Sequence, residues 1–226
     1  MIPSVNCIRM SGLVDYKTML AKQRAVQQAV ASGDTPSTLF LLEHIPTITL
    51  GRNALRDHVL CDSKKLTQEK VDIITTDRGG DVSYHGPGQL VAYPVFNLHQ
   101  WQPSVDWYLR TLEETVIQIL GRYGLKGDRI PKYTGVWVEG AKVAAIGIAI
   151  KHWVSWHGFA LNINPNMEHW RLIVPCGIKN KPITSLAQLL PAVPPMQEVI
   201  THCIAAFEET FACTITETTL DEPKES

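Results

Sequence analysis

The sequence predicts a single α+β domain, and three observations lead to this fold class. The chain has 226 residues, of which 45% are hydrophobic, and its net charge is −1. This composition is sufficient for one packed core and argues against disorder. Amphipathic helical patterns occur near the middle of the chain and near its end. Several consecutive short strands lie between them, and such segregation favours α+β over a doubly wound parallel sheet.

The N-terminal third is predicted to alternate between strands and helices. A helix is expected over Tyr16–Ala31, because Asp15 can cap its first turn and Gly33 follows its end. A shorter helix is expected over Ser63–Glu69. The predicted strands of this third are Val5–Arg9, Leu39–Glu43, Thr47–Leu50 and Val71–Thr75.

The remaining two thirds contain the clearest helix of the chain. It is predicted over Ser104–Tyr123, with Ser104 as its cap and Gly124 after its end. The other expected elements are strands Leu90–Phe96, Gly135–Val138, Val143–Ile150, Val154–Trp156, Phe159–Ile163 and Cys213–Thr216, and helix Met196–Thr210. We expect the domain to span residues 1–217 and Thr218–Ser226 to form a loose polar tail.

A glycine-rich run is the most informative segment. Residues 78–89 read Arg-Gly-Gly-Asp-Val-Ser-Tyr-His-Gly-Pro-Gly-Gln. We expect an irregular loop between two core strands, whose exposed N–H groups could hold a carbonyl, a carboxylate or a phosphate. The spacing matches neither a P-loop nor a dinucleotide fingerprint. A long turn kept for its geometry alone is the alternative.

Several classes of function are disfavoured by composition. The near-zero charge implies no basic face for nucleic acid. The uncharged apolar run Val143–Ile150 is too short to span a membrane, and the N-terminus lacks a signal-peptide pattern. Five cysteines without a Cys-x-x-Cys motif suit the reducing cytoplasm. His152 and His157 lie among tryptophans and are interpreted as packing or surface residues, so no metal is expected.

Two residues could carry covalent chemistry. Cys176 lies in a Pro-Cys-Gly sequence that restrains the backbone around its thiol, although a buried structural thiol is the alternative. Lys142 opens an apolar strand, and an ammonium near a thiol favours the reactive thiolate. A solvated lysine at the end of a strand is the alternative for Lys142.

Small residues recur on two neighbouring predicted strands. Ala144, Ala145 and Gly147 lie on the first strand, and Gly158 and Ala160 lie on the second. They could leave a slot in the sheet surface, or they could simply accommodate the large aromatic residues nearby. The sequence supports both interpretations equally.

Four motifs occur in a fixed order along the chain. They are Arg-Gly-Gly-x-x-Ser-Tyr-His-x-Pro-Gly-Gln, Lys-Val-Ala-x-Ile-Gly, His-Gly-x-Ala-Leu-Asn and Pro-Cys-Gly-Ile. With these motifs the chain closely resembles the octanoyltransferases of protein lipoylation, which belong to the biotin/lipoate protein ligase superfamily. The resemblance runs from His44 to Leu186. It implies the catalytic-domain fold of these ligases, a mixed β-sheet flanked by helices.

The resemblance also implies roles for individual residues. Cys176 matches the nucleophile that carries the acyl thioester, and Lys142 matches its partner. Three segments match the substrate pocket. The implied substrate-binding residues are Arg78, Gly79, Gly80, Asp81, Val82, Ser83, Tyr84 and His85; Ala145, Ile146 and Gly147; and Gly158, Phe159 and Ala160. Ser83 departs slightly from the family, which more often has threonine there, but it keeps the hydroxyl.

The implied reaction is a two-step acyl transfer. Octanoyl would pass from the phosphopantetheine of acyl carrier protein to Cys176, and then to a lysine of a lipoyl domain. The implied acceptors are the E2 subunits of 2-oxoacid dehydrogenases and the glycine cleavage H protein. No cofactor is expected, because a thioester is already activated. N–H groups of Gly79, Gly80 or Gly177 could stabilise the oxyanion. We expect a monomer. Arg52, Arg56, Lys179 and Lys181 are candidates for binding the acidic carrier, and ordinary solvated residues are the equally weighted alternative.

Three rival functions remain open. An ATP-dependent lipoate-protein ligase would share the fold but would need no cysteine nucleophile. A cysteine-dependent thioester hydrolase could pair Cys176 with His85 or His157. A non-catalytic protein could bind acyl carriers or lipoyl domains. The His-Gly-Pro-Gly-Gln ending of the glycine-rich run and the Pro-Cys-Gly element favour the transferase.

Overall fold

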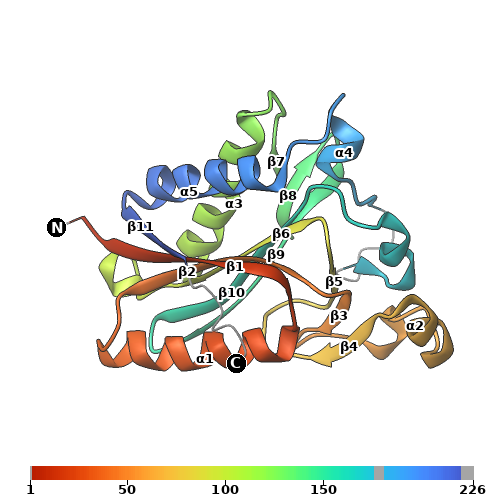
Figure 1. Cartoon of the computed structure of the whole chain (residues 1–226), viewed down its shortest axis with the longest axis horizontal. Helices are drawn as coiled ribbons and strands as arrows, with labels where there is room; N and C mark the ends of the chain where they lie inside the picture. The colour runs from red at the N-terminus through yellow and green to blue at the C-terminus, as the bar shows by residue number, and fades with distance from the viewer. Residues whose placement is uncertain (1, 176–180, 220–226) are drawn as a thin grey trace, which may run out of the picture.

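An eight-stranded mixed sheet forms the centre of the structure, a computed structural model that describes residues 2–175 and 181–219 (Figure 1). The strand order is β11-β1-β2-β6-β10-β9-β8-β7. β1 pairs in parallel with β2 and β11, and the other neighbours are antiparallel. The strands are β1 (Ser4–Val14), β2 (Ser37–His44), β6 (Gln89–Val95), β7 (Asp128–Ile130), β8 (Tyr133–Val138), β9 (Ala141–Lys151), β10 (Val154–Asn162) and β11 (Thr214–Thr219).

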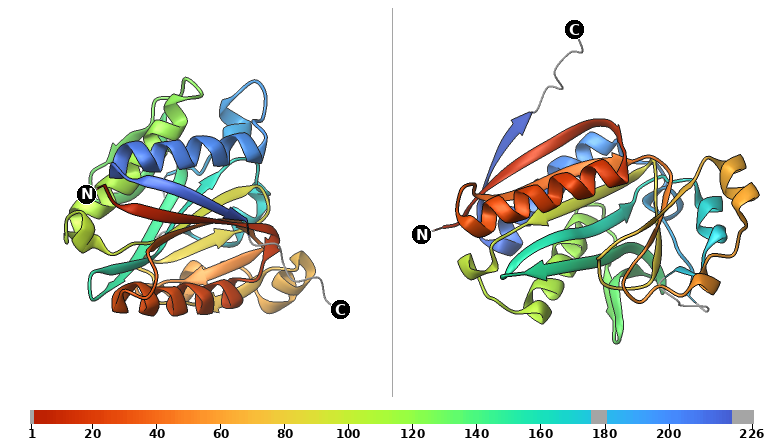
Figure 2. Two further views of the ribbon diagram at one scale, coloured as in Figure 1. Left: turned by 60° about the vertical axis from the view of Figure 1, so that its left-hand side comes forward. Right: turned by 90° about the horizontal axis from the view of Figure 1, so that it is seen from below.

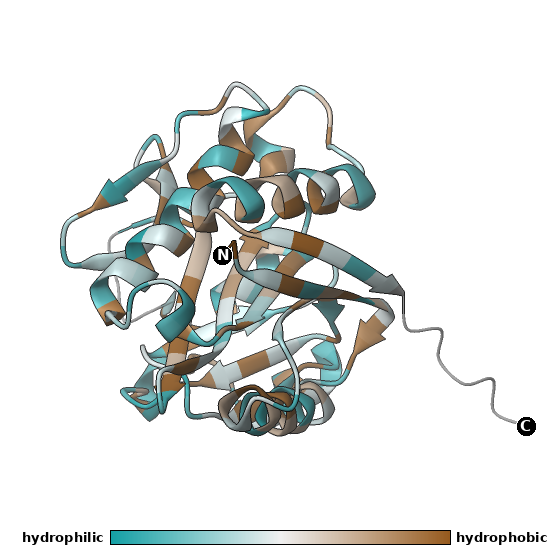
Figure 3. Ribbon diagram, turned by 90° about the vertical axis from the view of Figure 1, so that its left-hand side faces the viewer, coloured by the Kyte–Doolittle hydropathy of each residue, from teal (hydrophilic) through white to brown (hydrophobic). Residues whose placement is uncertain are grey.

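Helices cover both faces of this sheet (Figures 1 and 2). α1 (Tyr16–Ser32) packs on one face, while α3 (Val105–Gly121) and α5 (Met196–Phe211) pack together on the other. Hydrophobic residues recur along the strands that lie between these layers (Figure 3). The predicted mixed sheet flanked by helices is therefore confirmed.

The predicted helix caps are present. The Asp15 side chain accepts a hydrogen bond from the Thr18 N–H at 2.8 Å, and Ser104 accepts one from the Trp107 N–H at 3.3 Å. Gly33 ends α1 with a φ of 85°, a conformation that glycine adopts without strain. The capping residues in the sequence thus locate the starts of α1 and α3 correctly.

A smaller, three-stranded sheet stands beside the large one. It contains β3 (Thr47–Leu50), β4 (Asp72–Thr75) and β5 (Val82–His85) in the order β4-β3-β5, and α2 (Ser63–Glu69) precedes β4. The expectation of an irregular loop between two core strands is wrong in two respects. A third of the glycine-rich run, Val82–His85, forms β5, because branched and aromatic residues suit a strand. β4 belongs to the smaller sheet, where three of its four residues are exposed.

β10 is one strand where two were predicted. It pairs with β9 without interruption, but its pairing with β6 is broken around His157. There the backbone has a φ of 58°, and the His157 N–H donates to Gln23 Oε1 at 2.7 Å. Pro94 on β6, which has no N–H, lies opposite this break. The unusual backbone conformation of His157 therefore interrupts the pairing of β10 with β6 but does not end the strand.

The β9–β10 hairpin places His152 at the surface and His157 in the interior. His152 and Trp153 form its two-residue turn, with φ values of 52° and 57°, as in the turns that suit twisted strands. His152 is exposed, whereas His157 is 1% exposed. The interpretation of these two residues as surface and packing positions is confirmed.

Short helices occur between the main elements. They are η1 (Arg56–His58), η2 (Leu98–Gln100), η3 (Met167–Leu172) and α4 (Leu186–Leu189). β11 extends three residues past its expected end, and Thr218 and Thr219 pair with β1, so these two residues do not form a tail. The rest of the expected tail lies outside the described residues. Within residues 2–175 and 181–219, no helix has the length and apolar character needed to cross a membrane.

Candidate active site

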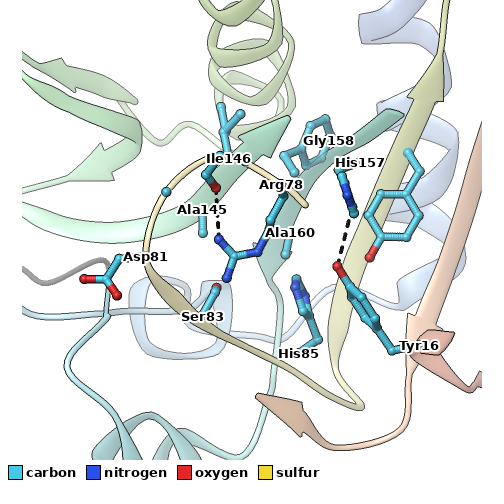
Figure 4. A pocket seen from close by; sticks show the side chains of 15 residues that line it. Tyr16, Arg78, Asp81, Ser83, His85, Ala145, Ile146, His157, Gly158 and Ala160 are labelled. Atoms are coloured by element: carbon cyan, nitrogen blue, oxygen red, sulfur yellow. Dashed lines mark hydrogen bonds between the residues drawn. The ribbon is translucent and has the colours of Figure 1, made fainter. Parts of the chain in front are cut away.

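A cavity lies where the glycine-rich run crosses β9 and β10 (Figure 4). The two sheets meet here, so the three segments predicted to bind substrate come together from distant parts of the chain. Twelve of the fourteen predicted substrate-binding residues line it. They are Arg78, Gly79, Gly80, Asp81, Ser83, His85, Ala145, Ile146, Gly147, Gly158, Phe159 and Ala160.

The other two predicted residues, Val82 and Tyr84, face away from the cavity. Side chains alternate along a strand, so Ser83 and His85 of β5 point to one side and these two point to the other. Tyr84 is fully buried against Trp170, and its hydroxyl lies 2.7 Å from His169 Nδ1. Val82 and Tyr84 therefore stabilise the small sheet and form no part of the cavity wall.

Arg78 joins the glycine-rich run to the small sheet. Its guanidinium donates to Thr49 Oγ1 through Nε at 3.1 Å and to the Thr49 carbonyl through Nη2 at 2.7 Å. Nη1 donates to the carbonyl of Gly79 at 3.0 Å. These bonds hold the cationic side chain, which is 7% exposed, along the cavity wall.

Glycines allow the walls of the cavity to approach each other. A Cβ at Gly147 would lie 3.0 Å from the Gly79 carbonyl oxygen and 3.2 Å from Arg78 Cδ. A Cβ at Gly158 would lie only 2.1 Å from the Ala92 carbonyl oxygen. The small residues Ala145, Gly147, Gly158 and Ala160 thus border a cavity, as the slot interpretation requires, and the two glycines also permit close packing against Gly79 and Ala92.

Three side chains close one end of the cavity and were not predicted to line it. Tyr16, Tyr93 and His157 are each at most 3% exposed. His157 Nε2 lies 2.8 Å from Asp77 Oδ1, and its Nδ1 lies 3.5 Å from the Tyr16 hydroxyl (Figure 4). His157 opens the His-Gly-x-Ala-Leu-Asn motif, so the sequence could have indicated it as a residue of the site. No local sequence pattern indicated the two tyrosines.

The histidines at this closed end are neutral. Burial lowers the pKa of His157 even though Asp77 opposes the shift, and a hydrogen bond from His157 lowers the pKa of the Asp77 carboxyl. Burial lowers the pKa of His44 to about 4 and that of His85 well below its usual value. A neutral His157 therefore donates Nε2–H to an ionised Asp77.

Two buried polar atoms of the cavity wall are available to a ligand. Ser83 Oγ and His85 Nδ1 have no hydrogen-bond partner among the described residues. Both residues are at most 7% exposed and both face the cavity from β5. Buried polar atoms are usually paired, so these two atoms suit a bound molecule or an ordered water.

The opposite end of the cavity is open and is formed largely by backbone. Gly80 is exposed there. Asp81 Oδ2 lies 2.5 Å from His58 Nδ1, and Asp81 Oδ1 accepts the Val82 N–H at 2.8 Å. The Gly79 N–H donates to the Ile148 carbonyl at 2.8 Å. This N–H is thus already engaged, which makes Gly79 a poor candidate for the oxyanion site.

Lys142 lines a second cavity that adjoins this open end. The two cavities share walls at Gly79, Gly80, Asp81, Ile146 and Gly147. Lys142 is 2% exposed, and its Nζ donates to the Thr134 carbonyl at 3.0 Å. The solvated strand-end alternative for this lysine is therefore excluded.

Cys176 lies outside the described residues, as do Gly177 and Lys179. On one side of this segment, the Val174 N–H donates to the His58 carbonyl at 2.7 Å. On the other side, the Lys142 N–H donates to the Pro182 carbonyl at 2.8 Å. The chain that resumes at residue 181 thus runs beside Lys142. No group of three or more His, Cys, Asp or Glu side chains that could hold a metal occurs in the part of the chain that the structure describes.

The lipoyl protein ligase A/B catalytic domain family matches residues 15–208. The chain belongs to this family. An octanoyltransferase of Nostoc sp. is 46% identical over 92% of this chain and 94% of its own length. An octanoyltransferase of Chloroflexus aggregans is 46% identical over 86% of this chain and 90% of its own length. The predicted family is confirmed, and these relatives are acyltransferases by name.

Solved structures of the family share the fold. A putative lipoate protein ligase from T. acidophilum with bound lipoic acid has a TM-score of 0.79 and 16% identity, covering 98% of this chain and 91% of that one. A lipoate-protein ligase A bound with ATP has a TM-score of 0.79 and 16% identity, covering 98% and 90%. The ligase-like catalytic-domain fold predicted from the sequence is therefore confirmed.

Proposed function

We propose that this acyltransferase moves an octanoyl group from acyl carrier protein to a lysine of a lipoyl domain through a thioester on Cys176. The observation that carries the proposal is the shape of the main cavity. It is closed and neutral at Tyr16, Tyr93 and His157, and it opens toward Lys142. An acyl chain would enter this cavity with its tail inward, which leaves its carbonyl near the lysine.

The cavity suits an alkyl chain in its energetics. At the closed end, the Tyr16 hydroxyl pairs with His157, the Tyr93 hydroxyl pairs with His44, and His157 also pairs with Asp77. These groups need no polar group from the ligand. Burial of each methylene contributes about 0.8 kcal/mol, so an octanoyl chain contributes around 5 kcal/mol before losses. This term favours an acyl group long enough to fill the cavity.

In the first step, the Cys176 thiolate attacks the carbonyl carbon of the octanoyl thioester. The new C–S bond forms as the bond to the carrier sulfur breaks, and the carrier leaves as a thiol after taking a proton. A charged Lys142 stabilises the Cys176 thiolate and supplies that proton. The free energy of one thioester is retained in the other, so neither nucleotide nor metal is required by this chemistry.

In the second step, the acceptor lysine attacks the acyl-Cys176 thioester. Its amine must be neutral, and Lys142, left neutral by the first step, accepts the proton that the amine loses. The C–S bond breaks and an amide forms. The Cys176 thiolate and a charged Lys142 are regenerated, so one amine serves as acid and then as base.

The acceptors we propose are lipoyl domains of 2-oxoacid dehydrogenase E2 subunits and the glycine cleavage H protein. One solved structural relative is described as an archaeal bipartite lipoate protein ligase and its E2 lipoyl domain. That protein shares the fold at 15% identity. The likeness supports a lipoyl domain as the acceptor of this chain as well.

The rival functions have less support. Identity to octanoyltransferases is 43–46%, against 16% for the ligase bound with ATP. A hydrolase would need a histidine base, but both ring nitrogens of His157 have partners. His85 lies on β5 and stacks on Tyr16 with ring centroids 5.6 Å apart. The paired nitrogens disfavour His157 as the base of a hydrolase, whereas His85 Nδ1 has no partner among the described residues.

Intact-protein mass spectrometry tests the covalent route. After incubation with octanoyl carrier protein, the wild-type chain should gain one octanoyl group that hydroxylamine removes. Cys176→Ala should gain none, while Cys203→Ala should still gain one, since Cys203 is a fully buried core thiol. Full transfer by Cys176→Ala would overturn the thioester intermediate.

A further inference from the structure

A single peptide group lies between two buried, charged side chains. Its N–H, from Gly135, donates to Glu113 Oε1 at 3.1 Å. Its carbonyl, from Thr134, accepts a hydrogen bond from Lys142 Nζ at 3.0 Å. Glu113 is fully buried, and Lys142 is 2% exposed. The carboxylate and the amine are thus connected through one peptide dipole.

Glu113 is held in place by two further hydrogen bonds. Its Oε2 accepts from Arg110 Nη1 at 2.5 Å and from Arg129 Nε at 3.1 Å. Arg110 is one turn earlier on α3, and Arg129 comes from β7. A buried carboxylate is costly unless it is paired and hydrogen-bonded. The two arginines meet this requirement and fix the carboxylate oxygen that faces Gly135.

Gly135 is suited to this arrangement by its lack of a side chain. Its φ is 130°, in the region that favours glycine, and an added Cβ would lie 2.7 Å from the Ala144 carbonyl oxygen and 3.3 Å from Lys142 Nζ. The pairing register of β8 and β9 shifts just after it, between Val136 and Trp137. Such irregularities often redirect groups at active sites.

We infer that Glu113 is a positioning residue for Lys142, acting through the Thr134–Gly135 peptide. By accepting the N–H, the carboxylate orients the peptide and polarises its carbonyl toward the amine. Hydrogen bonds in series strengthen one another in a low-dielectric interior. The inference rests on the proposed function, in which Lys142 exchanges protons at the open end of the cavity.

Other ionisable groups also face Lys142, and the test must leave them unchanged. Asp81, Lys132 and Tyr133 line the same cavity. The Lys142 and Lys181 amines stand over the Trp137 ring, 4.9 Å and 5.7 Å from its centroid. A substitution at Glu113 alters none of these residues, so a changed pH profile can be assigned to the linked peptide.

Glu113 and Glu114 offer a matched pair of variants. Both carboxylates bind Arg129, but Glu114 is 44% exposed and pairs only at the surface, at 2.6 Å. Glu113→Gln keeps an oxygen acceptor and loses the charge, whereas Glu113→Ala loses both. Glu114→Gln is the control. If Glu113→Ala fails to fold, Glu113→Gln still tests the inference.

We expect kcat for octanoyl transfer to fall by about tenfold or more in Glu113→Ala and less in Glu113→Gln. KM for the octanoyl donor should stay within about twofold, because the acyl cavity is intact. The pH at which turnover changes should move to lower values, since the charged amine loses a favourable partner. Glu114→Gln should match the wild type. An unchanged pH profile in both Glu113 variants would overturn the inference.

A second measurement is independent of octanoyl transfer. Reductive methylation of Lys142, followed by peptide mass spectrometry from about pH 7 to pH 10, reports how easily the amine loses its proton. Methylation should begin at lower pH in Glu113→Gln than in the wild type or Glu114→Gln. Equal curves would overturn the inference. Failure of the wild type to transfer octanoyl would instead reject the proposed function and leave this comparison valid.

Discussion

The two ends of the main cavity differ in the groups that form them. At the closed end, side chains from three elements interlock, with Tyr16 on α1, Tyr93 on β6 and His157 on β10. At the open end, the wall is mainly glycine backbone, flanked by Asp81 and Lys142. The closed end is part of the packed core, while the open end carries charge beside a second cavity.

This difference predicts that substitutions at the two ends affect different properties of the protein, the stability of the fold at one end and the transfer reaction at the other. Substitutions at the closed end should destabilise the fold before they change the reaction, because they disturb the contact between α1 and the large sheet. Substitutions at the open end should change transfer while the protein stays folded. The predictions below test this separation in order of decreasing effect.

Gly158→Ala should have the largest effect on stability. The added Cβ would lie 2.1 Å from the Ala92 carbonyl oxygen and 2.7 Å from Pro94 Cδ, so β6 and β10 would have to separate. We expect the free energy of unfolding to fall by about 3 kcal/mol or more in urea titrations. Gly121→Ala, where a Cβ meets nothing within 4 Å, is the control and should change it by less than about 1 kcal/mol. Equal stabilities would contradict the packing described for the closed end.

Acid should destabilise the closed end. Burial lowers the pKa of His44 to about 4, whereas an unfolded histidine titrates near about 6.5. Between these values the unfolded chain binds a proton that the folded chain does not, so stability falls as pH decreases from about 6.5 to about 4. The loss from this residue is about 3 kcal/mol over the window.

Urea midpoints measured against pH test this prediction with His44→Gln. The variant should show a weaker decline across the same window, because one of the proton-binding groups is gone. His85 and His157, whose pKa values are also lowered by burial, should leave a residual decline. An unaltered pH dependence in His44→Gln would show that the imidazole is not neutral in the fold.

Gly147→Val should affect transfer more than folding. Its side chain would project toward Gly79 and Arg78, where a Cβ alone comes within 3.0–3.2 Å. Overfilling of this kind costs about 1–3 kcal/mol, which here should reduce kcat/KM for octanoyl transfer. A short acyl donor should lose less than the octanoyl donor, because it needs less of the cavity. Equal losses for both donors, measured side by side, would place the acyl chain elsewhere.

Much of the fold could be predicted because local signals were strong. Asp15 and Ser104 cap helices where expected, and the bounds of α2 and β3 match the predicted ranges. The sequence did not predict β5 within the glycine-rich run, because the flanking glycines indicated a loop more strongly than residues 82–85 indicated a strand. Once β5 is recognised, its alternation explains why Tyr84 does not face the cavity.

The site was only partly predictable for a physical reason. The motifs identified the wall segments and Lys142, because the residues within each motif lie close together in sequence. The closed end depends on packing between distant elements, such as the contact between Tyr16 and His157, which are 141 positions apart. The link from Glu113 to Lys142 runs through a backbone peptide, and no side-chain pattern could have indicated it.

Lys181→Glu should have the smallest effect. This half-buried lysine lies beside the open end, with its amine 5.7 Å from the centre of the Trp137 ring. Charge reversal should raise KM for octanoyl carrier protein by a few-fold at low salt, and salt should reduce the difference. Octanoyl-pantetheine should react as before, and Lys17→Glu on α1 is the control. If both donors respond alike, the carrier does not dock through this residue.

Transfer to an acceptor lysine tests the central claim most directly. Purified chain, octanoyl carrier protein and a lipoyl domain are combined without nucleotide, and the domain is analysed by peptide mass spectrometry. We predict one octanoyl amide on the acceptor lysine, and a loss of about 100-fold or more in Lys142→Met that remains folded. Release of free octanoate with an unmodified lipoyl domain, or modification only when ATP is added, would contradict the account.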